Sequence, residues 1–428
     1  MTGTPVATPA AATPAAATAQ APARQGRLRL FAVLAGLYVS QAIPSYLFAA
    51  AIPPIMREAG VSRSAIGYFS ILFLPLVLKF LWAPLVDGVR PFARAHRAGW
   101  VVLTQLGVVA CILALTAVSP ADPVSILAIG FVAALLVSTQ DIATDGYAVK
   151  HLAPADRAIG NAIQGGSVAF GVVVGGTLGL VLYHRFGWHT MVLTVAGVSL
   201  LPVVAAFAMR EAPPAAAGGA PAPRPSVRAF LRRPEARAIL WIALTYRASE
   251  GLVKAMEGPY LVDAGVPLDV IGYISGGAAA TAGLAGSAVA AVLVRRAGLS
   301  ATLSLLGGVR TLCFLLFTLH AAGTLLGLWP ILGAAGLQTL IRYMEIVALY
   351  SLFMAVSSSE QPGTDFTTLS CAQLIVYLIG SLLSGRIADA LGYPALFGLA
   401  TALSGAAVLA TVALLRRAPP ATVARHHA

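Results

Sequence analysis

The nine residues Gly-Val-Ser-Arg-Ser-Ala-Ile-Gly-Tyr at positions 60–68 return as Gly-Val-Pro-Leu-Asp-Val-Ile-Gly-Tyr at 265–273, an offset of 205 residues. Two further markers recur at the same offset: Gly175 with Gly380, and the pair Gly187-Trp188 with the pair Gly392-Tyr393. Markers that share one offset indicate an internal repeat, and a repeat this long predicts a chain built from two related halves.

The composition around this repeat is that of a membrane protein. Of the 428 residues, 58% are hydrophobic and 10% are charged, whereas soluble domains average about 25% charged residues. This excludes a soluble enzyme, a disordered chain, a secreted disulfide scaffold and a nucleic-acid binder. The three cysteines lie in apolar runs without metal spacing or a disulfide pattern.

Apolar runs long enough to cross a bilayer, about 20 residues each, occur twelve times. They fall at 30–51, 64–86, 98–118, 123–149, 158–182, 188–209, 238–262, 268–294, 299–320, 326–356, 365–386 and 393–415. We therefore expect an all-α polytopic membrane protein with twelve transmembrane helices in two six-helix pseudo-repeats. The expected divisions are a disordered tail (1–29), a first bundle (30–209), a flexible Pro- and Ala-rich linker (210–237), a second bundle (238–415) and a tail (416–428).

The distribution of basic residues predicts the orientation. With the N-terminus in the cytoplasm, nineteen of the 28 Lys and Arg residues fall in inside segments, four in outside segments and five within spans. Cytoplasmic loops of membrane proteins carry such an excess of Lys and Arg. We expect both termini to be cytoplasmic, which also accounts for the net charge of +12.

Ionisable residues inside spans are costly and mark pathways or partners. Asp141 and Asp145 in the fourth span are four residues apart and share a helix face. Two carboxylates at low dielectric do not ionise together easily, so this pair is a candidate for proton coupling. The alternative is that Asp145 caps the helix or pairs with Lys150 or Arg157.

The seventh span carries four charges of alternating sign on one stripe: Arg247, Glu250, Lys254 and Glu257. We expect this stripe to face the bundle interior and to line a cavity, with Glu250 as a further candidate for proton coupling. The alternative is a structural ladder that locks the span to its neighbours.

In the tenth span, Arg342 and Glu345 are again three residues apart. Arg342 is the best single candidate to bind an anionic substrate group, because a guanidinium holds carboxylate or phosphate through two hydrogen bonds. Glu345, at the repeat equivalent of Gln140, is another candidate for proton coupling. Alternatively, Arg342 and Glu345 only satisfy each other.

The motifs Leu-Lys-Phe-Leu-Trp-Ala-Pro-Leu-Val-Asp (78–87), Ser-Thr-Gln-Asp-Ile-Ala-Thr-Asp-Gly-Tyr-Ala-Val (138–149) and Gly-Asn-Ala-Ile-Gln-Gly-Gly (160–166) support a family resemblance. They resemble the branch of the major facilitator superfamily that contains the muropeptide permeases (AmpG) and acetyl-CoA transporters. Within that branch, Gly146-Tyr147-Ala148 departs from the muropeptide permease pattern and most resembles siderophore importers of the RhtX/FptX type.

This resemblance implies a monomeric permease of the bacterial inner membrane that imports a ferric siderophore by proton symport. The substrate would be anionic or carry carboxylates, and its binding candidates are Lys79, Arg247, Lys254, Glu257 and Arg342. The alternatives are a muropeptide permease and a non-transporting membrane sensor. We expect no enzyme activity, cofactor or metal site, since the sequence has no Walker loop, metal spacing or nucleophile constellation.

The resemblance also assigns roles in the second span. Asp87 and the following Arg90, Arg94 and Arg97 are similar to the superfamily's gating loop. Lys79 has no acid within reach on its own helix, and the fourth span packs near the second in this family. We therefore expect Asp141 or Asp145 to be the resting partner of Lys79.

Overall fold

The computed structural model describes residues 24–62, 65–66, 68–93, 95–200, 203–211, 224–267, 270 and 278–417. Residues 1–23, 212–223 and 418–428 of the expected tails and linker, and Arg94 of the expected gating loop, lie outside the described residues. Within the described ranges the chain forms helices and turns, with one isolated bridge between Phe92 and Ala95.

The helices follow the expected spans closely. The α-helices are α1 (Arg24–Tyr46), α2 (Ile52–Glu58), α4 (Leu74–Leu78), α5 (Ala83–Gly88), α6 (Arg97–Ala114), α7 (Pro123–His151), α8 (Arg157–Gly171), α9 (Gly179–Leu200), α10 (Val203–Phe207), α11 (Val227–Arg232), α12 (Pro234–Thr245), α13 (Ala248–Asp263), α15 (Ala278–Ala321), α16 (Trp329–Val356) and α17 (Pro362–Arg417). Short 3₁₀ or π segments join them: η1 (Leu47–Ala51), η2 (Tyr68–Phe73), η3 (Lys79–Leu81), η4 (Leu115–Ala117), η5 (Pro154–Asp156) and η6 (Val172–Leu178).

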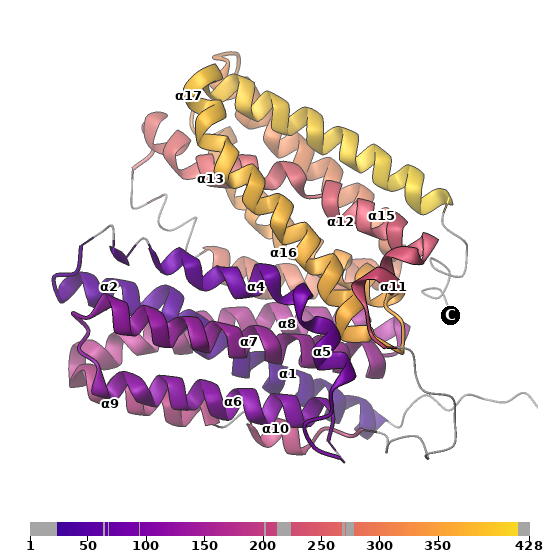
Figure 1. Ribbon diagram of the computed structural model, residues 1–428. Helices are drawn as coiled ribbons and strands as arrows, with labels where there is room; N and C mark the ends of the chain where they lie inside the picture. The colour runs from indigo at the N-terminus through magenta and orange to yellow at the C-terminus, as the bar shows by residue number, and fades with distance from the viewer. Residues whose placement is uncertain are drawn as a thin grey trace, which may run out of the picture.

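Seven of the described helical stretches are long and apolar enough to cross a membrane, and three of them are double length. Pro154–Phe207, Thr281–Ala321 and Pro362–Arg416 contain 54, 41 and 55 residues. At 1.5 Å per residue each is about 60 to 80 Å long, twice the hydrocarbon core or more. Each contains a left-handed glycine, Gly187, Gly298 or Gly392, and α17 visibly forms two arms that meet at one end (Figure 1). The three double-length stretches account for two membrane spans each, and the four single stretches for one each. Together with the broken segments 68–88 and 234–263, they fit the expected twelve spans.

The internal repeat is visible in the backbone. Gly60 and Gly265 have φ of +89° and +85°, and Gly187 and Gly392 have φ of +80° and +78°. Residues with a Cβ rarely adopt such φ values, so these glycines mark equivalent turns in the two halves.

The third marker pair fixes how helices pack within each half. A Cβ at Gly175 would lie 2.1 Å from Ile43 O, and one at Gly380 would lie 3.2 Å from Ala248 O. Ile43 and Ala248 are themselves 205 residues apart. The same helix pair therefore approaches backbone to backbone in both halves, which confirms the two-fold internal relation.

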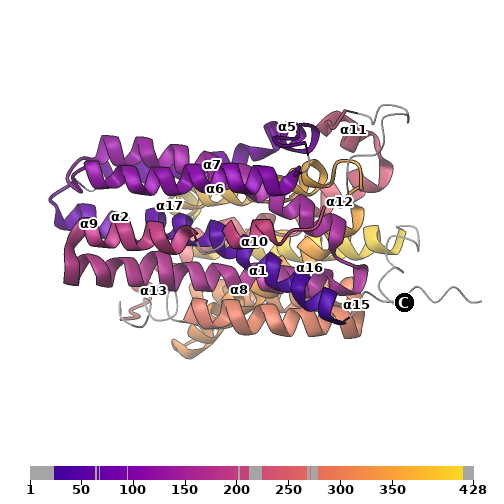
Figure 2. The same cartoon turned by 90° about the horizontal axis from the view of Figure 1, so that it is seen from below.

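The two halves lie against each other, and in Figure 1 the helices of the second half are inclined to those of the first. Figure 2 shows the same arrangement from below. The indigo-to-magenta helices of the first half occupy the lower part of Figure 1, and most of the orange and yellow helices occupy the upper part. α8 contacts α15 and α16, while α17 contacts α4, α5 and α7. Asn161 Nδ2 of α8 donates to Ser351 Oγ of α16 at 3.1 Å across this seam.

The second and seventh spans are broken, and the breaks carry charged residues. The second span is divided into η2, α4, η3 and α5, with Pro75 and Pro84 at the starts of α4 and α5 and Lys79 at the start of η3. The seventh span is interrupted at Arg247, whose φ and ψ of −109° and 14° are not helical. Irregular backbone at membrane depth is tolerated where it is buried in protein or lines a cavity.

Part of the expected flexible linker is helical. Residues 227–232 form α11, which Ser226 caps by accepting from Arg228 N at 3.2 Å, and α12 begins at Pro234. The division of the chain at 210–237 remains a proposal.

We predict that Gly175→Ala destabilises the first half. The added methyl group would overlap the Ile43 carbonyl and Leu47 N–H of α1–η1, and overpacking of this kind costs about 1–3 kcal/mol. Thermal unfolding of the detergent-purified protein should shift down by several degrees. Gly197→Ala is the matched control, since a Cβ there meets nothing within 4 Å. Equal melting temperatures for both variants would show that the close approach is not needed for stability.

Candidate functional site

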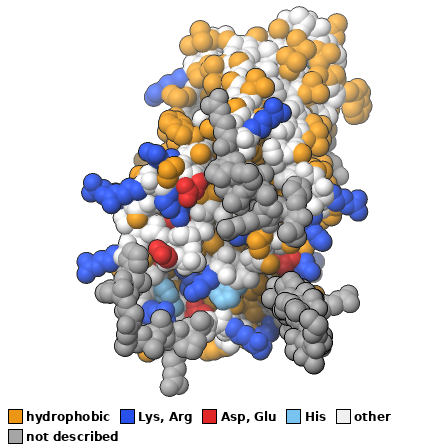
Figure 3. Space-filling model, turned by 90° about the vertical axis from the view of Figure 1, so that its right-hand side faces the viewer, with side chains coloured by type: hydrophobic (Ala, Val, Ile, Leu, Met, Phe, Trp, Pro, Cys, Tyr) orange, Lys and Arg blue, Asp and Glu red, His pale blue; other side chains and the backbone are white. Residues whose placement is uncertain are grey.

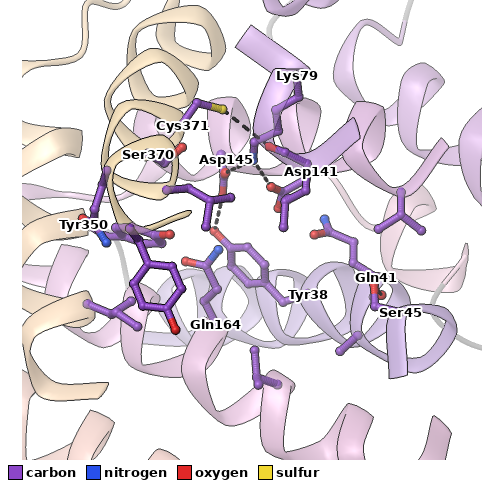
Figure 4. Close-up of a pocket in the computed structure, with 18 of the residues that line it drawn as sticks. Tyr38, Gln41, Ser45, Lys79, Asp141, Asp145, Gln164, Tyr350, Ser370 and Cys371 are labelled. Carbon is purple, nitrogen blue, oxygen red and sulfur yellow. Dashed lines mark hydrogen bonds and ion pairs between the residues drawn. The ribbon is translucent and has the colours of Figure 1, made fainter. Parts of the chain in front are cut away.

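A central cavity of 340 Å³ lies between the two halves. The first half lines it with residues of α1, η3, α7 and α8, and the second half lines it with Arg247 and residues of α16 and α17. Figure 4 shows polar side chains converging on it, among them Tyr38, Gln41, Lys79 and Asp141. Within the described ranges, no three His, Cys, Asp or Glu side chains are grouped so that they could hold a metal ion.

The wall from the first half is built on Lys79. Its ammonium is ion-paired with Asp141 and lies 4.0 Å from Asp145 Oδ2. Tyr38 OH donates to Asp145 Oδ1 at 3.1 Å. The expected partnership of Lys79 with these aspartates is confirmed. The alternative in which Asp145 pairs with Lys150 or Arg157 is wrong, because the carboxylate is buried beside Lys79 and Tyr38.

The break in the second span explains how Lys79 reaches this wall. The 3₁₀ segment η3 interrupts the helix after α4, so the Lys79 side chain does not point where a continuous α-helix would place it. It points toward Asp141 of α7 instead (Figure 4). The Lys79 side chain is 5% exposed, and those of Asp141 and Asp145 are 13% and 1% exposed. Asp141 is thus the carboxylate of this cluster most open to the cavity.

Arg247 and Arg342 form the facing wall from the second half. Arg247 is ion-paired with Glu250, and Arg342 Nε lies 3.1 Å from Glu250 Oε1. The Arg342 side chain is 32% exposed, and its guanidinium lies 5.4 Å from the centre of the Tyr377 ring. Arg342 is therefore the cation on this wall that a ligand can reach.

Glu345 lies behind this wall and binds an arginine that the sequence did not single out as its partner. Arg310 Nη1 donates to both Glu345 carboxylate oxygens, at 2.7 and 2.8 Å, and Arg310 Nη2 donates to Tyr246 O at 2.7 Å. The expected alternative, a closed Arg342–Glu345 pair, is wrong. An intramembrane arginine without an acid on its own span was the signal that could have identified Arg310.

Lys254 and Glu257 form an ion pair of 2.8 Å, but neither lines the central cavity. Glu250 and Glu345 also stand behind it rather than in its lining. The expected stripe is thus divided, and Arg247 alone of its four members lines the cavity.

The two walls differ in formal charge. One lysine faces two aspartates on the first wall, whereas three arginines (Arg247, Arg310 and Arg342) share Glu250 and Glu345 behind the second. With every group ionised, the first cluster carries an excess negative charge and the second an excess positive charge. A ligand anion is therefore attracted to the second wall, and a proton to the first.

Asp87 joins the two halves at one end of the bundle. From α5 it accepts from Thr364 N at 2.6 Å and Gly363 N at 3.3 Å, at the start of α17. Arg97 Nη2 donates to its Oδ1 at 2.5 Å. A carboxylate is favourable at a helix N-terminus, where backbone N–H groups have no helical partner. We call this contact of Asp87 with Gly363 and Thr364 the latch.

An ion pair within the second half lies at the same end. Arg233 Nη2, before α12, donates to Asp365 Oδ2 at 2.7 Å, and Gln361 Nε2 donates to Asp365 Oδ1 at 2.6 Å. The first half has a counterpart in the ion pair between Arg27 and Asp156. In each half, an arginine near the start of the first span thus holds an aspartate beside the start of the fifth. Neither pair was predictable from helical spacing, because the members of each pair are more than 100 residues apart.

We predict that Asp87→Asn weakens the latch while leaving the fold intact. The amide keeps the shape but loses the charge that faces Arg97 and the α17 N-terminus, a change worth about 1 kcal/mol or roughly fivefold in the opening equilibrium. Spin labels at the exposed positions Ala153 and Arg296, with the native cysteines replaced, should report longer distances. Asp122→Asn is the control, because Asp122 caps α7 within one half. An unchanged distance distribution would mean that the latch does not hold the halves together.

The comparisons with known proteins agree with this architecture. The chain is 25% identical over 403 residues to the anhydromuropeptide permease of Escherichia coli (strain K12), covering 89% of this chain and 80% of that protein. The transporter FucP, solved in its outward conformation, superposes with a TM-score of 0.68 at 14% identity, over 91% of this chain and 99% of that one. A bacterial homologue of the iron transporter ferroportin gives a TM-score of 0.66 at 17% identity, over 91% and 100%.

At these identities the two solved structures share the fold alone with this chain. The expected closeness to siderophore importers is not shown by any of these matches. Residues 34–344 match the Major Facilitator Superfamily, and the chain belongs to that family of membrane transporters.

Proposed function

We propose that this protein is a proton-coupled secondary transporter that imports an anionic sugar-peptide of the muropeptide class across the bacterial inner membrane. The observation that carries the proposal is the central cavity, with the accessible Arg342 on one wall and the Lys79–Asp141 pair on the other. The similarity to the anhydromuropeptide permease over 89% of the chain supports the substrate class.

Arg342 is suited to hold a substrate carboxylate. Its partner Glu250 is shared with Arg247, so the guanidinium keeps donors for a ligand, and a guanidinium binds carboxylate through two hydrogen bonds. The guanidinium also lies over the ring of Tyr377, within the range of a cation–π interaction.

A second cavity extends the space available to a large substrate. It has a volume of 360 Å³ and shares Ser45, Leu76 and Val137 with the central cavity. Its remaining lining is largely apolar and includes Phe48 and Phe69. A sugar-peptide offers carboxylates for the charged cavity and carbon-rich ring faces for the apolar one.

Coupling follows from the charge excess around Lys79. A substrate carboxylate that approaches the ammonium competes with Asp141 for it. The displaced Asp141 then faces Asp145 without its counter-ion, and a proton on Asp141 removes that repulsion. Substrate and proton are thus bound together, as symport requires.

The orientation is proposed from the charges. The basic end, which carries Asp87, Lys150, Arg224 and Arg233, gathers Lys and Arg on its surface (Figure 3). By the positive-inside rule this end faces the cytoplasm. Both termini are then cytoplasmic, and the latch closes the cytoplasmic side while the substrate site is approached from the periplasm.

Ferric siderophore import, which the sequence motifs favoured, is the second candidate, and the comparisons lend it no support. A non-transporting sensor is the third. We keep both as outcomes of the substrate experiment.

The first functional prediction concerns the substrate. Purified protein in liposomes with an acidic exterior should accumulate radiolabelled anhydromuropeptide, and Arg342→Gln should weaken its apparent affinity about tenfold through loss of a charged hydrogen bond. Arg185→Gln, an exposed cation outside the cavity, should behave as wild type. Uptake of a ferric siderophore in place of the muropeptide would overturn the substrate class, and uptake of neither would favour the sensor.

The second concerns coupling. Asp141→Asn should abolish accumulation driven by the pH gradient while retaining exchange of labelled for unlabelled substrate, since the amide binds but cannot carry the proton. Asp389→Asn, an exposed acid outside the cavity, is the control. If Asp141→Asn still concentrates substrate as wild type does, Asp141 is structural, and Glu250 or Glu345 becomes the candidate.

A further inference from the structure

A cavity of 340 Å³ at the basic end is separate from the central site and borders the latch through Asp87. Its lining includes four cations, Arg90, Arg97, Lys150 and Arg224, and three acids, Asp87, Glu211 and Glu360. The balance between these charges depends on which of them are already paired.

Two of the three acids accept hydrogen bonds from backbone N–H groups at helix N-termini. Asp87 accepts from Gly363 N and Thr364 N as well as from Arg97. Glu211 accepts from His96 N at 2.7 Å and from Arg97 N at 2.8 Å, so that it caps the start of α6. Their negative charge is therefore offset by unpaired N–H groups and helix dipoles before any surface cation is considered.

The cations, in contrast, have capacity left. Arg97 is 4% exposed, its Nη2 is bound to Asp87 and its Nη1 is buried against Gly146 of α7, so this capacity belongs to the other three cations. Arg90, Lys150 and Arg224 are exposed at the rim, and the structure gives none of them an ion pair with a described carboxylate. Glu360 is the one exposed acid among the described residues of the cavity lining, so the three rim cations outnumber the exposed carboxylates there.

The neighbouring imidazole of His96 does not add to the positive charge. Its Nε2 lies 2.9 Å from Val86 O, and burial lowers the pKa of His96, so the ring is neutral at physiological pH. The positive excess therefore comes from arginine and lysine, the side chains that bind phosphate most strongly.

We propose that this cavity binds a phosphate-bearing anion, and that the bound anion holds the latch closed. Arg90 and Lys150 belong to the first half, whereas Arg224 leads into α11 and the second. An anion bound by both sets joins the halves beside Asp87. A ligand that binds the latched arrangement better shifts the equilibrium toward it by its difference in affinity, so the anion slows the transport cycle.

Two sources can supply this chemistry, a free phosphate-bearing solute and the headgroup of an anionic lipid. The probe for the first is pyrophosphate, titrated into the full-length protein in phosphatidylcholine nanodiscs and followed by calorimetry. Wild type should bind it, and the double variant Lys150→Gln/Arg224→Gln should bind at least about tenfold more weakly, because two charged hydrogen bonds are lost. The matched control is Arg295→Gln/Arg296→Gln, which removes two exposed cations outside the cavity.

The second arm replaces phosphatidylcholine with phosphatidylglycerol. If the headgroup is the ligand, phosphatidylglycerol should displace pyrophosphate and should shorten the distance between spin labels at positions 153 and 296. Because one label occupies position 296, the control variant in the distance measurement is Arg295→Gln alone. Effects of either ligand that are lost only in Lys150→Gln/Arg224→Gln support the site. Equal loss in Arg295→Gln/Arg296→Gln, or no binding of either ligand, would overturn it. These measurements need no substrate, so their failure is distinct from failure of the proposed transport.

Discussion

The constraint on which this structure depends is that a charge buried at membrane depth must have a counter-ion. Lys79, Arg247 and Arg310 are buried between apolar helices and Arg342 is partly buried, and each of the four is held by a carboxylate. Except for Arg247, which lies at a helix break, and Glu250 in the first turn of the helix that follows, these pairs join different spans. The same contacts that neutralise the charges therefore also set how the spans pack around the central cavity.

The breaks in the second and seventh spans serve this pairing. Lys79 lies in a 3₁₀ turn, and Arg247 has a non-helical backbone conformation between α12 and α13. A straight helix would fix the direction of each side chain by its position in the turn. The breaks free both cations from that geometry, so that Lys79 reaches Asp141, while Arg247 reaches Glu250 and approaches Glu345.

Much of the fold was predictable because it depends on local sequence. The length of apolar runs located the spans, and the 205-residue repeat identified equivalent glycines whose φ values prove nearly equal. The partnership of Lys79 with Asp141 was also predictable, since no acid on its own span was near. The ion pairs of the second half were not predictable. A spacing of three residues suggested that Arg342 pairs with Glu345. In the structure Arg342 pairs with Glu250 from another span, and Glu345 pairs with Arg310. Asp87 illustrates the same limit: its sequence context showed a charged turn, but not that the α17 N-terminus lies against it.

The Arg310–Glu345 pair has a consequence for biosynthesis. Arg310 lies in the second arm of α15 and Glu345 in α16, so the cation leaves the ribosome before its counter-ion. An arginine at the centre of a span costs about 2.5–3.5 kcal/mol when it enters the bilayer alone. Partition of the second arm of α15 into lipid is thus more favourable once α16 has been translated, and the two spans should leave the translocon as a pair. Lys79 must wait longer, because a complete span separates it from Asp141. The order in which charges find their partners therefore makes membrane insertion of this chain a cooperative process.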